Sequence, residues 1–146
     1  MRGSVDLRSV VRASGSEHDV DLFETLSLEL GRDGRDPWTG HFMARAAWDI
    51  DGSSAQFPSL ADAEGHAFDA QVYSAYARIT ATSGITALNI GRHFIYDTPV
   101  VLWLDGLSGE SAEQGKARWK TRAFAGVPVH AFEAHTTGAF VVGVNE

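Results

Sequence analysis

The sequence predicts an α+β fold in which antiparallel strands surround a single helix. Apolar and polar residues alternate with a period of two up to residue 50 and again beyond residue 84, as expected of half-buried strands. Between these regions, residues 59–78 open with a Ser-x-x-Asp pattern after Pro58 and are rich in alanine, which favours a helix. The chain shows no repeat or linker, so its 146 residues are expected to form a single domain.

The amino-acid composition argues against several classes of function. The chain is 44% apolar, and no apolar run approaches the roughly 18 residues of a membrane-spanning helix. The sequence has no cysteine and no apolar segment typical of a secretory signal, so we expect a cytoplasmic protein without a membrane partner. The net charge of −7 argues against nonspecific nucleic-acid binding.

The strands are expected at the alternating segments, which Gly, Pro and Asp residues separate. Residues 105–115 are expected to form a loop, and the tail of the helix, residues 72–80, is rich in tyrosine and β-branched residues and is alternatively a strand. The expected strands cover residues 5–12, 20–30, 41–50, 85–96, 100–104, 116–125, 127–135 and 138–144.

Three polar residues stand in the first half of the predicted helix. At 100° per residue, Asp62 and His66 fall opposite the apolar arc, whereas Glu64 falls inside it and is directed at the sheet. Burying an unpaired carboxylate costs several kcal/mol, so Glu64 extends its carboxylate to solvent, pairs with an arginine or serves chemistry. Asp62 is the second candidate, although the preference of a first helical turn for an acid also explains it.

Three segments resemble the hotdog-fold acyl thioesterases of the phenylacetate-pathway type. They are "SLADAEGHAF", "ITALNIGRHFIYDTPV" and "GKARWKTRAFAGVPVHAFEAHTTGAFVVGV". The resemblance implies an antiparallel sheet wrapped around one central helix, a homodimer or tetramer, and an acyl-CoA or acyl-carrier-protein substrate without a cofactor. It also implies that Glu64 is the general base or nucleophile, with oxyanion donors near Leu60. The family's His-Gly-Gly before the helix is replaced here by "DGSSAQFPS".

A basic segment is the second candidate for binding. Lys116, Arg118, Lys120 and Arg122 alternate, so a strand places all four on one face. They either pair with acids on neighbouring strands or hold an anion, such as the phosphates of coenzyme A or an acidic carrier protein. The predicted substrate-binding set consists of Leu60, Trp48, Phe94, Arg118, Lys120 and Arg122.

No metal site is predicted. Asp49-x-Asp51-Gly52 is interpreted as a turn, because Ala47 and Pro58 occupy positions where a calcium loop needs ligands. Two other function classes stay open: a β-rich protein that holds an apolar ligand among its aromatic residues, and an immunity-type interaction module that uses the acidic first half. The aromatic residues concerned are Trp48, Phe94, Tyr96 and Trp103.

Overall fold

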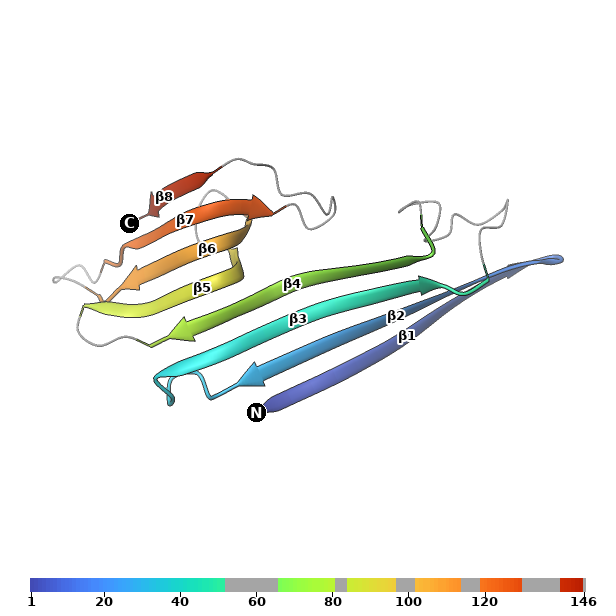
Figure 1. Cartoon of the computed structure of the whole chain (residues 1–146), viewed down its shortest axis with the longest axis horizontal. Coiled ribbons are helices and arrows are strands. Elements are labelled where there is room, and N and C mark those ends of the chain that lie inside the picture. Colours follow the sequence, from blue (N-terminus) through green and yellow to red (C-terminus); the bar gives the residue numbers. More distant parts are fainter. Residues whose placement is uncertain (52–65, 81–83, 97–101, 114–118, 130–139, 146) are drawn as a thin grey trace. The chain divides into compact units, whose positions relative to one another are not determined.

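The described part of the chain is an antiparallel β-sheet. The computed structural model describes residues 1–51, 66–80, 84–96, 102–113, 119–129 and 140–145. Neighbouring strands pair in chain order, from β1 to β8 (Figure 1). The strands are β1 (Arg2–Ser14), β2 (Glu17–Leu30), β3 (Trp38–Asp49), β4 (Phe68–Ile79), β5 (Ile85–Ile95), β6 (Leu102–Ser111), β7 (Arg122–Val129) and β8 (Val141–Asn145).

The predicted α+β class is wrong, because the described residues contain strands and no helix. Where the central helix of a hotdog-like fold was expected, Phe68–Ile79 forms β4 and pairs with β5 through Ala77 and Ile90. Alanine favours a helix only weakly, and cross-strand pairing of the tyrosine-rich tail outweighs that preference. The alternative reading of this tail as a strand is confirmed. Residues 59–65 of the predicted helix lie outside the described part of the chain.

Two boundaries also differ from the prediction. β6 runs through residues 105–111, which were expected to be a loop, and β7 continues through Gly126. Glycine and serine are poor strand formers alone, but here they are paired within the sheet, for example Gly109 with Leu88 and Ser108 with Phe124. Among the described residues, no helix is long and apolar enough to cross a membrane.

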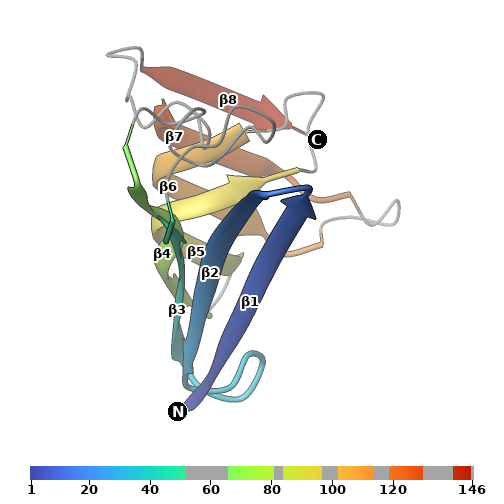
Figure 2. The ribbon, with the colours of Figure 1, turned by 90° about the vertical axis from the view of Figure 1, so that its right-hand side faces the viewer.

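The chain divides into two compact units. Unit 1 comprises Met1–Arg2, Leu28–Phe42 and Tyr73–Glu146, and unit 2 comprises Gly3–Ser27 and Met43–Val72. Unit 1 contains the whole of β5, β6, β7 and β8, which Figure 2 shows as neighbouring strands. Its apolar core is small and consists of Ile95, Leu104 and Phe124, with Leu102 and Val141 packed against them.

The register of unit 1 separates two faces of its sheet, because directly opposed residues on antiparallel strands share a face. One face, called the exposed face below, is almost entirely apolar. It is formed by Ala75, Ala77, Ile79, Leu88, Ile90, Phe94, Trp103, Leu107, Ala123, Ala125, Val127, Val142 and Val144. The other, called the buried face, carries the small core and most polar side chains, including Asn89, His93, Ser108, Glu110 and Arg122.

A row of glycines crosses the buried face. Gly91 pairs with Gly106, and Gly106 pairs with Gly126 on the next strand. A Cβ atom at any of the three would collide with the backbone of the adjacent strand, and Gly91 has a φ of 118°, which L side chains rarely adopt. The row therefore allows the strands to approach one another more closely than side chains would permit.

The start of β5 is irregular. Ile85 pairs with Ser111 and Ala87 pairs with Glu110, so Thr86 is an extra residue opposite an uninterrupted β6. Its hydroxyl donates to the Ser111 carbonyl oxygen at 2.7 Å. This is a β-bulge, and it sets the phase with which the residues after it alternate between the two faces.

Candidate functional site

A chain of polar side chains lies on the buried face of unit 1. His93 is 3% exposed and Ser108 is 5% exposed. Nδ1 of His93 lies 2.9 Å from the Gly91 carbonyl oxygen, which only accepts, so this nitrogen carries the proton of the neutral ring. Nε2 then accepts from the Ser108 hydroxyl at 2.7 Å, and the Ser108 oxygen accepts from Nδ2 of Asn89 at 3.1 Å.

Burial lowers the pKa of His93, against the opposing effects of the Gly91 carbonyl and Asp105. The ring is therefore held neutral at neutral pH, with a proton at Nδ1 and an acceptor at Nε2. A hydroxyl beside a neutral imidazole can be oriented or can exchange its proton. The amide oxygen of Asn89 receives no hydrogen bond, although it is buried.

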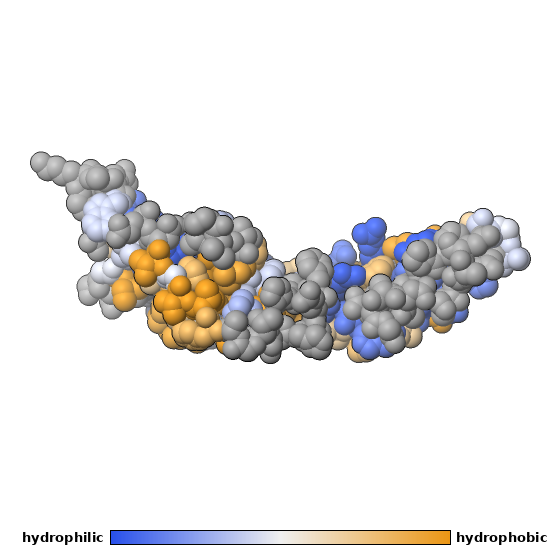
Figure 3. All heavy atoms as spheres, turned by 90° about the horizontal axis from the view of Figure 1, so that it is seen from above, coloured by the Kyte–Doolittle hydropathy of each residue, from blue (hydrophilic) through white to orange (hydrophobic). Residues whose placement is uncertain are grey.

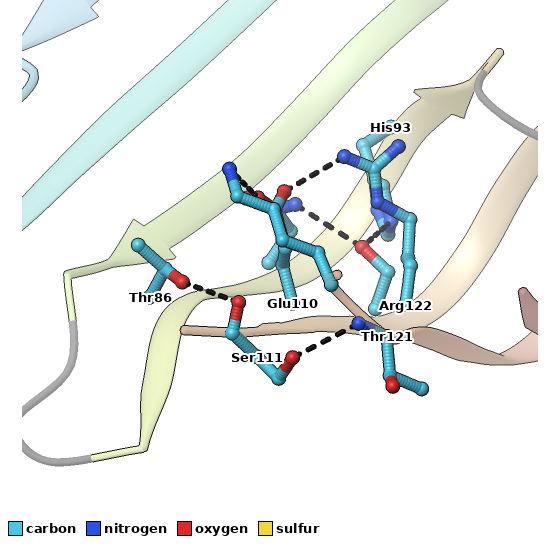
Figure 4. Close-up of polar contacts among 9 residues, drawn as sticks. Thr86, His93, Glu110, Ser111, Thr121 and Arg122 are labelled. Atoms are coloured by element: carbon cyan, nitrogen blue, oxygen red, sulfur yellow. Dashed lines mark hydrogen bonds and ion pairs between the residues drawn. The ribbon is translucent and has the colours of Figure 1, made fainter. Parts of the chain in front are cut away.

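Beside this chain lies a cluster of charged residues around Glu110. Nη2 of Arg122 donates to Glu110 Oε2 at 2.8 Å, and Nζ of Lys120 donates to Glu110 Oε1 at 3.1 Å (Figure 4). The bond from Arg122, more than that from Lys120, lowers the pKa of Glu110. Arg122 and Lys120 are two of the four basic residues that the sequence places on one strand face.

The polar chain borders a cavity of about 350 Å³ that lies within unit 1. β4 contributes Arg78 and Tyr76, and the β5 and β6 groups described above complete much of the wall. Burial raises the pKa of Tyr76, so its hydroxyl keeps its proton at neutral pH. The described residues that line the cavity are Ser74, Tyr76, Arg78, Asn89, His93, Phe94, Ile95, Tyr96, Trp103, Ser108 and Arg122.

A second polar group in unit 1 lies at the start of β3. The Thr39 hydroxyl donates to Asp33 Oδ1 at 2.7 Å, and Nε2 of His41 lies 3.4 Å from the same oxygen. The Thr39 bond is the largest cause of a lowered pKa at Asp33. His41 stacks on Tyr76 with ring centroids 4.6 Å apart, so this group supports one wall residue of the cavity.

Unit 2 contains the group of described residues best suited to a cation. Ligand atoms of Asp19, Asp49 and Asp51 lie within 4.8 Å of one another. Asp19 also pairs with Arg12, which reaches Asp21 at 3.1 Å, and the backbone N–H of Val20 donates to Asp51 at 2.7 Å. Asp49 and Asp51, interpreted from sequence as a turn, thus meet a third carboxylate from β2. Arg12 supplies part of the positive charge that this group requires.

The predicted site residues are only partly described. Glu64, Asp62, Leu60 and Arg118 lie outside the described residues, as does Lys116. Trp48 contacts Phe68 in unit 2, with ring centroids 5.2 Å apart. In unit 1, Phe94 lies 4.9 Å from Trp103 and 6.1 Å from Tyr96 between ring centroids.

Sequence reasoning did not identify His93, Ser108, Asn89 or Arg78. Ser108 and Glu110 stand in the segment expected to be a loop, so no partner was sought for them. The alternation of Asn89, Gly91 and His93 with Leu88, Ile90 and Phe94 was the available signal, since it separates a polar face from an apolar face on one strand. The chain matches no family model, no curated protein and no solved structure.

Proposed function

We propose that the protein is a lipid-contacting β-sheet, in which the exposed face of unit 1 lies against acyl chains. The observation that carries this proposal is the inversion of the usual burial pattern. Ile90 is 42% exposed and Val144 is 67% exposed on the apolar face, whereas His93 and Ser108 are buried on the other. Strands that contact lipid alternate in this way, with apolar side chains toward the lipid.

The extent of the apolar surface supports the proposal. Hydrophobic surface is gathered over the part of the molecule that holds β8 (Figure 3). Elsewhere in unit 1, a depression of about 530 Å³ is lined by apolar side chains from β2, β3 and β4, including Leu28, Leu30 and Phe42. Contiguous apolar surface of this kind marks an interaction site for protein or membrane.

Charges on the exposed face are also neutralised locally. Arg92 and Asp105 are opposed in register and form a two-point ion pair, with bonds of 2.7 and 2.6 Å. The Asp105 carboxylate raises the pKa of Arg92, so the guanidinium stays charged and paired. A mutually neutralised pair is far less costly next to lipid than a single charge.

Aromatic rings gather at one end of this face. Tyr73, Phe94 and Trp103 meet where β6 begins and β5 ends, beside the middle of β4, and the ring centroids of Tyr73 and Trp103 are 6.2 Å apart. Trp and Tyr are enriched where a membrane-contacting protein meets the headgroups.

A lipid-contacting role differs from two expectations from sequence, a cytoplasmic location and the absence of a membrane partner, and both of these stay predictions. Hydrolysis of an acyl thioester stays a prediction, and its candidate base Glu64 lies outside the described residues. A second copy of the chain is the competing occupant of the exposed face, because a homo-oligomer is also predicted.

Tryptophan quenching distinguishes lipid from water at the exposed face. In a variant that keeps Trp103 and replaces Trp38, Trp48 and Trp119 by Phe, we expect phosphatidylcholine vesicles with brominated acyl chains to quench the fluorescence. Aqueous iodide should quench it only weakly. Quenching by iodide alone would contradict the proposal.

A charge introduced on the exposed face tests how much lipid contact contributes to the free energy of vesicle binding. Leu107→Arg should weaken vesicle binding by about 2–4 kcal/mol, the cost of a basic side chain near the middle of a bilayer. Ser16→Arg, in the turn between β1 and β2, adds the same charge outside unit 1 and should bind as the wild type does. Equal binding by the two variants in a flotation assay would show that Leu107 does not meet lipid.

A further inference from the structure

The described residues give the cavity a positively charged wall. Arg78 and Arg122 both line it, and the lining residues that the structure describes include neither aspartate nor glutamate. Glu110 pairs with Arg122 from beside the cavity, so Arg122 is partly neutralised. A concave site with one sign of charge attracts ligands of the opposite sign.

Arg78 is a charged residue of the cavity wall whose guanidinium forms no ion pair or hydrogen bond with any residue in the described part of the chain. Its charge contributes to the lowered pKa of Asp33, but Asp33 bonds to Thr39 and not to Arg78. An arginine fork that lines a cavity in this state matches the two oxygens of a carboxylate.

A second unsatisfied group lies opposite Arg78. Arg78 and Asn89 are directly paired in register on β4 and β5, so their side chains share the buried face. Nδ2 of Asn89 donates to Ser108, while its buried Oδ1 receives no hydrogen bond from any residue that the structure describes. Leaving a buried acceptor unpaired costs about 1–3 kcal/mol, so a bound group with an O–H or N–H would satisfy it.

We propose that this cavity binds a small hydroxylated carboxylate, with the carboxylate on Arg78 and a hydroxyl donating to Oδ1 of Asn89. The volume of about 350 Å³ falls within the range of small-molecule sites. His93 and Ser108 complete the wall with a fixed order of donors and acceptors, which favours a polar ligand over an apolar one.

Three ring compounds test separately whether the carboxylate and the hydroxyl groups of the ligand contribute to binding. Galacturonate carries a carboxylate and hydroxyls, galactose carries hydroxyls alone, and cyclohexanecarboxylate carries a carboxylate alone. In isothermal titration calorimetry of the full chain, galacturonate should bind roughly tenfold or more tightly than either of the others. Failure of galacturonate to bind at millimolar concentration, or equal binding of all three, would overturn the proposal.

Two substitutions assign the contacts. Arg78→Ala should weaken galacturonate binding roughly tenfold or more, and Arg78→Lys should weaken it less because the charge remains. Asn89→Leu should weaken binding of galacturonate and leave that of cyclohexanecarboxylate unchanged. Arg35→Ala removes an exposed arginine that does not line the cavity and serves as the matched control. Equal affinity in the wild type and both Arg78 variants, each with wild-type circular dichroism, would show that Arg78 does not hold the ligand.

Discussion

At the scale of single residues, one backbone carbonyl sets the direction of the hydrogen bonds among the buried polar groups of unit 1. The Gly91 carbonyl fixes the proton on Nδ1 of His93, and this makes Nε2 the acceptor for Ser108. The direction of each hydrogen bond from Asn89 to Gly91 follows from that single constraint. A network with a fixed direction presents a ligand with one pattern of donors and acceptors.

The lowered pKa of His93 predicts a dependence of stability on pH. Because the folded pKa lies below the usual value near 6.5, the unfolded state binds the proton more readily, and stability falls as the pH falls from about 6.5 through the folded pKa. The lowered pKa values of Glu110 and Asp33 cause a further loss only below about pH 4.5.

His93→Gln should remove much of the loss of stability between pH 7 and pH 5.5, since glutamine does not titrate. The measurement is urea unfolding at both pH values, in the same detergent or lipid. His66→Gln replaces an exposed histidine and should retain the wild-type loss. An equal loss in the wild type and His93→Gln would exclude His93 as its source.

At the scale of strands, the sequence predicted which segments form strands better than it predicted where those strands end. β1, β2, β3 and β5 have apolar residues at every second position, and this period is enough to identify a strand. β4 was assigned to a helix because its alanines fit the period of a helix as well as that of a strand. Only its pairing with β5 decides between helix and strand. The second half of β6 is rich in Gly and Ser, which local propensity assigns to loops.

The candidate site residues that the sequence identified follow a local pattern, whereas those that it missed are brought together by pairing between strands. Lys120 and Arg122 were found from a local alternation of charge, whereas their common partner Glu110 lies on another strand and within an expected loop. Arg78 and Asn89 are opposed only through the register of β4 and β5. Sites assembled across strands depend on long-range pairing, which a single sequence does not specify.

The glycine row predicts which glycines of β6 tolerate a side chain. Gly106→Ala places a Cβ against the backbone of Ala125 and Gly126, so we expect a loss of stability of about 1–3 kcal/mol. Gly109→Ala on the same strand places a Cβ 3.9 Å from Leu88 Cδ1, an ordinary contact, and should have little effect. Thermal unfolding of the two variants gives the comparison, and equal midpoints would show that the strands can separate at Gly106.

At the scale of the whole molecule, the distribution of apolar surface governs behaviour in solution. Many large apolar side chains are exposed in both units, among them Val5 and Leu7 of unit 2 and Val142 of unit 1. Water-exposed surface of this kind drives association, and a detergent micelle or a bilayer provides an alternative cover.

Light scattering separates these outcomes for the chain of 15.8 kDa. Without detergent we expect large, polydisperse particles, and in a mild detergent we expect a single species with one or a few chains per micelle. A monodisperse dimer in water, unchanged by detergent, would favour a second copy of the chain as the cover. That outcome would agree with the predicted homodimer and contradict lipid contact.

The bulge at Thr86 has a consequence for insertions and deletions in β5. The bulge shifts the alternation of side chains between the two faces by one residue. Thr86 is therefore an extra residue in β5 relative to β6. Loss of Thr86 would leave the faces of residues 88–94 unchanged, because the shift in phase is taken up next to the turn. Loss of a residue within 88–94 would exchange the faces of its neighbours and bring His93 or Asn89 to the apolar side. Related chains that differ in length should therefore carry the difference before Ala87 and not after it.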